Sequence, residues 1–243
     1  MPAIAYHALP DGRRIAYRHL AGSGPCLVFL PGYMSDMDGS KATASMTRAQ
    51  ERGRACLLLD YSGCGSSDGD FTDGTLTRWR DEVLALVDHV GAERVVLVGS
   101  SMGGWLMLLV GLALGERLAG LVGIAAAPDF TQWGYDEDQR ARLAAGETIY
   151  EDSDYGYDPM PTHARFWADG QANLLLESEI AIDCPVRLLH GQADADVPHA
   201  ISLRLAAALR SADVHVLLVK DGDHRLSREA DVALLLETIE RLA

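Results

Sequence analysis

The sequence lacks several features that would assign it to other classes of protein. Its four cysteines make no Cys-x-x-Cys pair and fall mostly in or beside apolar runs, which predicts reduced, buried thiols. Its longest apolar run, residues 105–114, is far shorter than the roughly 20 residues that span a bilayer, and we interpret it as a buried helix. Basic residues number 21 against 35 acidic ones, for a net charge of -14, so nucleic acid and membrane surfaces are poor partners.

The amino terminus lacks the patterns of two targeting signals. Residues 1–7 contain no basic start followed by an apolar stretch, which a secretory signal requires, and no Arg-rich presequence of the mitochondrial kind. Reduced thiols are also typical of a reducing compartment. We therefore expect a cytoplasmic protein.

The sequence does contain a repeated alternation of buried strands and helices. Its 243 residues and 48% apolar content suit an α/β protein with a substantial core. Short apolar runs recur without strict alternation, as parallel strands buried on both faces require. They are residues 26–30, 55–59, 95–98, 121–126, 186–189 and 214–219, and helical spacing fits residues 76–90, 102–114, 198–210 and 227–242.

Two further segments complete the predicted fold. Residues 4–9 and 15–20 alternate in polarity around Asp11-Gly12 and predict an antiparallel hairpin. Residues 129–180 show no clear buried strand and hold 12 acidic residues against 3 arginines, a net charge of -9, which predicts an acidic helical lid. We expect a mostly parallel, doubly wound α/β sheet, with a core of residues 1–128 and 181–243 and a lid insertion at 129–180.

The pattern Gly-x-Ser-x-Gly occurs twice, and its surroundings separate the two copies. Residues 99–103 directly follow an apolar strand and open a long apolar helix, as a sharp turn requires if it is to expose a serine hydroxyl above the sheet. Residues 65–69 follow a polar, glycine-rich loop with neither element beside them. We therefore predict Ser101, and not Ser67, as a nucleophile. The alternative for Ser101 is a serine that only caps its helix.

A nucleophilic serine needs a base, and the base needs an acid that orients it. Asp194 and Asp196 both lie just past the carboxyl end of a predicted parallel strand. Asp194 is the preferred acid, because Asp196 is better placed to cap the following helix. His224 follows the last predicted strand and is the expected base, whereas His190 is expected to pack beneath the site.

Acyl transfer also needs two N–H donors for the transition-state oxyanion. We expect them at Met102, which follows the nucleophile, and at Tyr33, in the turn after the first parallel strand, where an ordinary tight turn is the alternative. The glycine-rich loop at 60–65 lacks the ending of a phosphate cradle, and Asp60 is expected to tie loops together. Three lid carboxylates lack calcium-loop spacing and favour a solvated acidic face, namely Asp152, Asp154 and Asp158.

Taken together, these residues resemble the α/β-hydrolase superfamily over essentially the whole chain. Residues 30–37 and 223–225 are similar, more narrowly, to the subfamily that contains a mitochondrial acyl-glucuronide esterase and palmitoyl-protein thioesterase. The resemblance implies hydrolysis of acyl esters or thioesters with no cofactor. We also expect no metal site.

The expected activity is that of a serine esterase or thioesterase acting on a small-molecule acyl ester or thioester. Carboxylates of the lid that face the pocket repel polyanionic groups, so neutral, short to medium acyl esters are the preferred substrates. The same catalytic residues suit a serine peptidase or amidase, and the fold alone suits a non-catalytic receptor or scaffold. Both remain alternatives.

Overall fold

The computed structural model describes residues 1–151 and 159–242 of the chain. Eight strands in this part of the chain form the central sheet, and each predicted parallel run overlaps one of them. The strands are β1 (Ala5–Ala8), β2 (Arg14–Leu20), β3 (Ser23–Leu30), β4 (Arg54–Leu59), β5 (Val95–Ser100), β6 (Leu118–Ile124), β9 (Val186–Gly191) and β10 (Val214–Val219).

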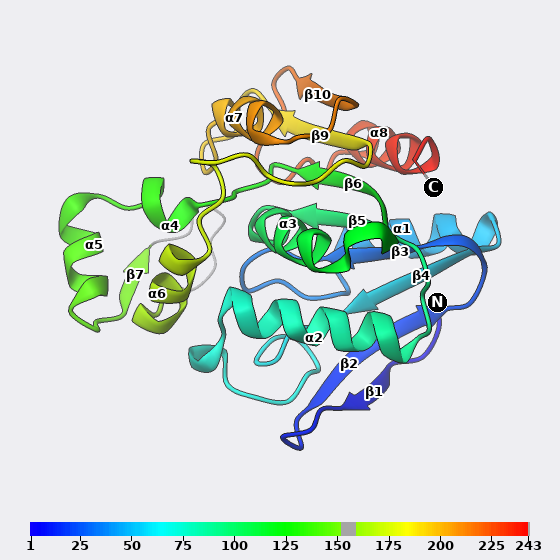
Figure 1. The fold of residues 1–243 in the computed structure, drawn as a ribbon, viewed down its shortest axis with the longest axis horizontal. Helices are drawn as coiled ribbons and strands as arrows, with labels where there is room; N and C mark the ends of the chain where they lie inside the picture. Colours follow the sequence, from blue (N-terminus) through cyan, green and yellow to red (C-terminus); the bar gives the residue numbers. More distant parts are fainter. Residues whose placement is uncertain (152–158, 243) are drawn as a thin grey trace.

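The order of the strands across the sheet is β1-β2-β4-β3-β5-β6-β9-β10. β1 and β2 form an antiparallel hairpin, β2 joins β4 antiparallel, and all pairs from β4 to β10 are parallel (Figure 1). The direction of winding reverses between β3 and β5, and open α/β sheets bind ligands at the carboxyl ends of strands beside such a reversal. The predicted fold class is confirmed.

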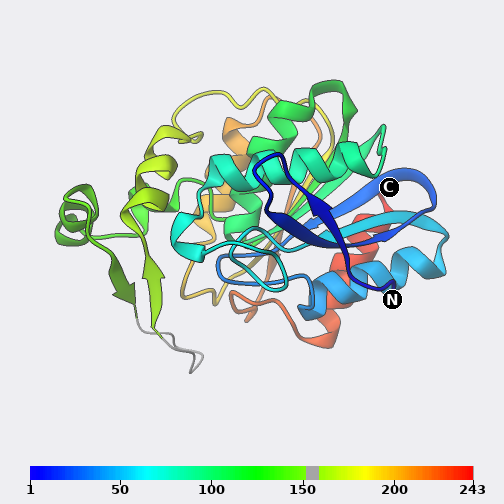
Figure 2. The ribbon, with the colours of Figure 1, turned by 90° about the horizontal axis from the view of Figure 1, so that it is seen from below.

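Helices cover both faces of the sheet (Figure 2). One face carries α2 (Leu76–His89), α3 (Met102–Leu114) and α7 (Ala200–Ala208), and the other carries α1 (Ser40–Glu51) and α8 (Glu229–Glu240). Single turns of 3-10 helix, η1 (Phe71–Asp73) and η2 (Gly115–Arg117), precede α2 and follow α3. Within residues 1–151 and 159–242, no helix combines the length and the apolar character needed to cross a membrane.

Helix α1 is not predicted by the apolar spacing of its sequence. Its buried stripe recurs at helical spacing but consists mostly of small residues, which carry little apolar surface, namely Ala42, Ser45, Met46 and Ala49. Small side chains let α1 pack closely on β4 and beside α8.

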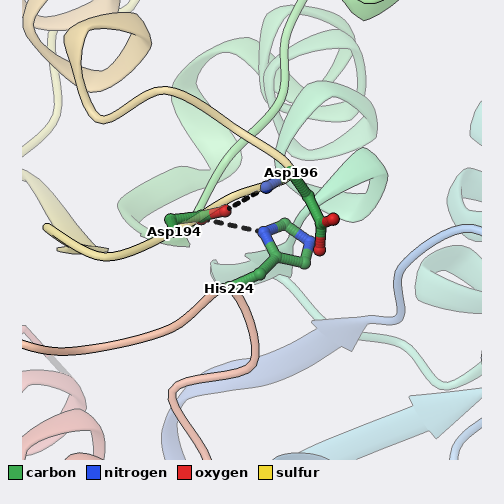
Figure 3. Close-up of side chains that lie close together, drawn as sticks. All are labelled: Asp194, Asp196 and His224. Atoms are coloured by element: carbon green, nitrogen blue, oxygen red, sulfur yellow. Dashed lines mark hydrogen bonds and ion pairs between the residues drawn. The ribbon is translucent and has the colours of Figure 1, made fainter. Parts of the chain in front are cut away.

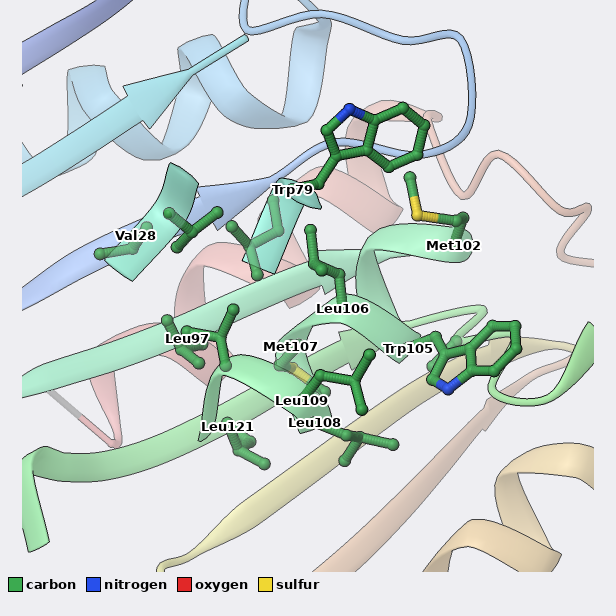
Figure 4. Packing of buried hydrophobic residues seen from close by; sticks show 14 of the residues in the cluster. Val28, Trp79, Leu97, Met102, Trp105, Leu106, Met107, Leu108, Leu109 and Leu121 are labelled. Carbon is green, nitrogen blue, oxygen red and sulfur yellow. The ribbon is translucent and has the colours of Figure 1, made fainter. Parts of the chain in front are cut away.

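The core on the opposite face is built around α3 (Figure 4). Every residue from Met102 to Gly111 is buried, which confirms the prediction of a buried helix. Trp79 of α2 is fully buried beside it and stacks on Tyr61, with the ring centroids 5.2 Å apart. Its indole N–H donates to the Ser62 carbonyl at 3.1 Å, so the polar atom of this large side chain is satisfied.

The chain leaves the sheet after β6 and returns at β9, and the segment between them lies beyond the carboxyl ends of the strands (Figure 1). It contains α4 (Phe130–Trp133), α5 (Glu137–Ala144), β7 (Ile149–Glu151), β8 (Met160–Thr162) and α6 (Ala164–Ala172). β7 and β8 pair antiparallel, so the insertion combines helices with a small sheet where the sequence predicts helices alone. The acidic residues considered for calcium binding, Asp152, Asp154 and Asp158, lie outside the described residues.

Asp129 joins the two ends of this insertion. It lies at the start of the segment, with a φ of 59°, and is fully buried. Its carboxylate accepts the N–H groups of Leu175 at 2.9 Å and Leu176 at 2.7 Å, near the end of the segment. Burial raises the pKa of Asp129, and these hydrogen bonds oppose the rise. The insertion is therefore a loop whose two ends are held at one point of the core.

Leu106→Ala is expected to lower the free energy of unfolding by about 2–5 kcal/mol, because Leu106 is fully buried on α3 and its truncation leaves a cavity. Leu112→Ala in the same helix is the matched control. Leu112 is 37% exposed, so its truncation is expected to cost less than about 1 kcal/mol. Urea unfolding followed by circular dichroism measures both losses, and equal losses would contradict the packing described for α3.

Candidate active site

Ser101 lies at a sharp turn between β5 and α3. Its backbone angles, a φ of 54° and a ψ of -121°, are rare for a residue with a side chain. Its N–H donates to the Ile124 carbonyl at 2.9 Å, and its carbonyl accepts the N–H of Ala127 at 3.1 Å. The end of β6 therefore holds the strained turn and keeps Ser101 at the carboxyl edge of the sheet.

Two glycines make this turn possible. A Cβ atom on Gly99 would lie 2.3 Å from the Gly103 carbonyl oxygen, and one on Gly103 would lie 2.2 Å from the Leu30 carbonyl oxygen. Side chains do not approach backbone atoms this closely, so both positions need glycine. The Gly-x-Ser-x-Gly spacing thus reflects how tightly α3 packs against the ends of β3 and β5.

His224 joins Ser101 to Asp194. Its Nε2 lies 3.0 Å from Oγ of Ser101, and its Nδ1 lies 2.9 Å from Oδ2 of Asp194. An ionised carboxylate only accepts hydrogen bonds, so we assign the ring proton to Nδ1, which leaves Nε2 to accept the serine hydroxyl. Figure 3 shows Asp194 and His224 side by side. The structure therefore brings together the three residues predicted from β5, β9 and β10.

The Asp194 carboxylate is buried and extensively hydrogen bonded. Its side chain is 0% exposed, and Oδ1 accepts the N–H groups of Asp196 at 3.0 Å and Val197 at 2.8 Å. Burial by itself would raise the pKa of Asp194, but hydrogen bonds from His190 and His224 outweigh it, and the pKa lies well below its ordinary value of 3.8. Asp194 is therefore an anion at neutral pH.

The sequence-based expectation understates the role of His190. This residue is fully buried, as expected, but it also contacts the acid. Its Nε2 lies 3.2 Å from Oδ2 of Asp194 and 2.9 Å from the Val197 carbonyl, and its Nδ1 lies 2.7 Å from Oγ of Ser202. Both neighbours of Nε2 are acceptors, so Nε2 carries a proton and donates to Asp194. The signal in the sequence was a histidine four residues before the acid, at the end of a buried strand.

Asp196 does not take the place of Asp194. It is exposed, and the N-cap of α7 is His199, so the helix cap predicted for Asp196 is wrong. Ligand atoms of Asp194, Asp196 and His224 lie within 4.8 Å of one another, close enough for one cation. Both ring nitrogens of His224 already face Asp194 and Ser101, however, so this donor set fits proton transfer better than metal binding.

The second Gly-x-Ser-x-Gly copy ties loops together. Ser67 donates its hydroxyl to the Asp60 carbonyl at 2.7 Å and accepts the N–H of Ala16 at 2.8 Å. The Asp60 carboxylate in turn accepts the N–H groups of Met37 at 2.7 Å and Ser66 at 2.8 Å, which agrees with the role expected for it. The hydroxyl of Ser67 is therefore used to hold these loops together.

Tyr33 and Met102 belong to the two segments that border Ser101. Met102 is the first residue of α3, so its N–H has no acceptor within the helix. The turn that contains Gly32 and Tyr33 lies close to Ser101, since a Cβ atom on Gly32 would be 3.5 Å from Cβ of Ser101. Met34, with a φ of 54°, bends the chain directly after Tyr33. Both segments therefore border Ser101, and the N–H groups of Tyr33 and Met102 stay the predicted donors to the oxyanion.

The Tyr33 side chain ties this turn to the insertion. Its hydroxyl donates to the Pro161 carbonyl of β8 at 2.9 Å, and burial raises the pKa of the phenol, so it stays protonated. The ring centroid lies 4.9 Å from that of Phe166 in α6 and 5.0 Å from that of Phe71. An aromatic cluster thus joins the insertion to the edge of the sheet that carries Ser101.

A doubly wound sheet that presents a serine on a strand-to-helix turn, with an aspartate and a histidine on later loops, defines the α/β-hydrolase class. The comparison with known proteins agrees, because the Alpha/beta hydrolase family matches residues 27–237. The chain belongs to this family. The expected superfamily and the expectation of a hydrolytic enzyme are confirmed at the level of the family.

Its relatives include palmitoyl-protein thioesterase ABHD10, mitochondrial, of Homo sapiens, which is 38% identical over 99% of this chain and 80% of the relative. The structure of alpha/beta hydrolase domain-containing protein 10 from mouse is similar with a TM-score of 0.91 and 38% identity, over 99% of this chain and 98% of that one. A putative hydrolase from Agrobacterium vitis S4 has a TM-score of 0.91 and 39% identity, over 99% of both chains. The predicted resemblance to the subfamily that contains a mitochondrial palmitoyl-protein thioesterase is also confirmed.

These relatives correct the expected location. A cytoplasmic protein was predicted, whereas relatives that match 99% of this chain are named as mitochondrial proteins. The cytoplasmic prediction is therefore wrong. Unpaired cysteines fit more than one reducing compartment, so they did not single out the cytoplasm.

Asp194→Asn is expected to make the free energy of unfolding depend less on pH under acidic conditions. The pKa of Asp194 is lower in the folded chain than in the unfolded one, so its ionisation stabilises the fold above the unfolded-state pKa, and this contribution is lost as the pH falls towards the folded-state pKa. Free energies of unfolding, measured with urea between about pH 6 and pH 3, should fall more steeply for the wild type than for the variant.

The matched control is Asp196→Asn, which removes an exposed carboxylate from the same loop. It should keep most of the slope of the wild type, because the histidines and the N–H groups that hold Asp194 ionised are unchanged. Equal slopes for the wild type and Asp194→Asn would contradict the account of Asp194 as a carboxylate stabilised in its ionised form by two histidines.

Proposed function

We propose that this chain hydrolyses acyl esters or thioesters through an acyl-enzyme formed on Ser101. The observation that carries the proposal is the line of hydrogen bonds from Ser101 through His224 to Asp194, in the order nucleophile, base and acid. A serine hydroxyl is a weak nucleophile on its own, and a positioned imidazole activates it by taking its proton.

The reaction proceeds in two halves. Oγ of Ser101 attacks the acyl carbonyl carbon while Nε2 of His224 takes the hydroxyl proton, and the N–H groups of Tyr33 and Met102 bind the resulting oxyanion. As the tetrahedral intermediate collapses, the bond to the leaving oxygen or sulfur breaks and His224 protonates that atom. A water molecule, deprotonated by the same nitrogen, then attacks the acyl-enzyme, releases the carboxylic acid and restores Ser101.

Asp194 stabilises the imidazolium that exists between these proton transfers. Its low pKa keeps it ionised, so it attracts the cation on His224 without taking the Nδ1 proton. His190 supports this role, since its N–H fills a second acceptor site of the carboxylate and fixes the orientation of the acid. Asp194 is thus held ready before the substrate arrives, which is the condition for electrostatic catalysis.

The substrate class follows from the relatives and from charge. The names of the relatives favour an S-acyl substrate, and they extend the acyl chains to be tested up to palmitoyl. The insertion carries a net charge of -9, although Asp129 and Asp136 are used within it, to join its ends and to cap α5. The negative potential of the other carboxylates disfavours polyanionic leaving groups. We therefore propose neutral acyl esters and thioesters as preferred substrates. No cofactor, nucleic acid or membrane partner enters this proposal.

The same three residues support a serine peptidase or amidase, which is the second candidate. The leaving group then is an amine, whose departure depends on protonation by His224 more strongly than that of a thiol. Comparing turnover of an ester and an amide that share one acyl group separates the two candidates. A non-catalytic scaffold is disfavoured, because Ser101, His224 and Asp194 are all in hydrogen-bonding position.

Ser101→Ala is expected to lower kcat on a neutral p-nitrophenyl ester by about 10⁴-fold to 10⁶-fold, because the variant lacks the hydroxyl on which the acyl-enzyme is proposed to form. Labelling by a fluorophosphonate probe should be abolished. Ser67→Ala, in the second copy of the motif, is the matched control and should keep both turnover and labelling. Labelled Ser101→Ala, or an unlabelled wild type that hydrolyses no ester, would overturn the proposed function.

The charge of the leaving group is tested with two thioesters that share one acyl chain. An acyl-coenzyme A carries several phosphate charges, whereas the acyl-N-acetylcysteamine is neutral. We expect a higher kcat/KM for the neutral thioester at low salt, and an increase for the coenzyme A thioester as added salt screens the repulsion. A kcat/KM that is highest for the coenzyme A thioester and falls steeply with salt would exclude the proposed preference.

A further inference from the structure

Lys41 occupies a position that elementary electrostatics disfavours. It is the second residue of α1, and the N-terminus of a helix carries a partial positive charge that repels cations. The first turn of α1 contains no acidic residue that would offset this repulsion. Lysine is also rare in this chain, which has only Lys41 and Lys220 among 21 basic residues. A residue that breaks local preferences in this way needs a compensating interaction.

The surroundings of Lys41 also disfavour the positive charge of its side chain. The side chain is half-buried, and burial, followed by the positive charge of Arg225, lowers the pKa of its amine. Asp223, from the loop before α8, and Asp231, from α8 itself, act in the opposite direction. Charges of both signs therefore surround the ammonium group, in the region where α1 and α8 lie side by side (Figure 2).

The compensating interaction is a hydrogen bond to the histidine loop, which we define as residues 221–226. Nζ of Lys41 donates to the main-chain carbonyl of Arg225, the residue that directly follows His224. A cationic donor binds a carbonyl more strongly than a neutral one does, because the bond is charge-assisted. The contact reaches from α1 across to the loop that carries the histidine.

The histidine loop needs support from outside itself. Both of its end residues have positive φ values, 58° and 41°, although neither is glycine, and such conformations persist only where neighbours hold them. On the amino-terminal side of His224, the N–H of Ala193 donates to the Gly222 carbonyl at 2.9 Å. On the carboxyl-terminal side, the contact comes from Lys41. The loop is thus braced on both sides of its histidine.

We infer that Lys41 is a positioning residue, which holds the histidine loop through the Arg225 carbonyl and so keeps Nε2 of His224 aligned with Oγ of Ser101. The inference rests on the proposed function, because alignment matters only where His224 moves a proton. Without the ammonium group, the strained loop relaxes and the 3.0 Å contact between His224 and Ser101 is formed for a smaller fraction of the time. Chemistry that depends on this contact slows in proportion.

The test replaces Lys41 with methionine, which keeps the stem of the side chain and removes the donor. We expect kcat on a neutral p-nitrophenyl ester to fall about tenfold or more, with KM little changed, because misplacement of a catalytic group acts on the chemical step. The far-downfield proton resonance of His224 Nδ1–H, which reports its bond to Asp194, should broaden or disappear. Lys41→Arg, which keeps a cationic donor, should restore kcat to within about twofold of the wild type.

Lys220→Met is the matched control, because it removes the other lysine, exposed directly before the histidine loop, and it should change neither kcat nor the resonance. Lys41→Gln, whose amide falls short of the Arg225 carbonyl, is a second variant with the same expected loss should the methionine variant fold poorly. All variants are assayed well below their melting temperatures.

The inference is overturned by a folded Lys41→Met or Lys41→Gln protein with the kcat and the His224 resonance of the wild type. It is also overturned if kcat falls while the resonance stays sharp, since a merely structural residue lowers activity in that way. These outcomes are distinct from failure of the proposed function, in which the wild type itself shows no labelling and no ester turnover.

Discussion

The turn at Ser101 is the constraint on which the rest of the architecture depends. Ser101 has a φ of 54°, and this backbone conformation costs a residue with a side chain about 1–3 kcal/mol. Ser101 keeps it because the packing of the neighbouring residues permits no other conformation. The first turns of α3 pack so closely on the ends of β3 and β5 that Gly99 and Gly103 cannot carry side chains. The position of the hydroxyl is therefore fixed by packing of the core, before any polar contact at the site is considered.

One buried anion organises the polar part of the site through two unlike histidines. His190 is enclosed, and its Nε2 faces only acceptors, so it remains a donor to Asp194. His224 is 17% exposed, and its Nε2 faces the hydroxyl of Ser101. The carboxylate thus contacts one enclosed imidazole and a second imidazole that reaches the serine hydroxyl. This division explains how a carboxylate with no exposed surface stays ionised.

The sequence predicted the doubly wound sheet and the placement of Ser101, Asp194 and His224 after its strands, because apolar runs and turn motifs are local signals. Helix α1 could not be predicted, because its buried stripe consists of alanine, serine and one methionine and gives little apolar signal. The strands β7 and β8 are too short to show an alternation of polarity. The contacts of His190 and Lys41 could not be predicted either, because each joins elements that only the folded chain brings together.

Asp129 has a consequence for how proteins of this kind diversify. Because one buried carboxylate holds the departing and returning segments of the insertion together, the distance between those points does not depend on the length of chain between them. Residues can be gained, lost or exchanged in that interval without shifting β6 or β9. The chain between these anchor points can therefore change in sequence or length, while the edge of the sheet that carries Ser101 keeps its geometry.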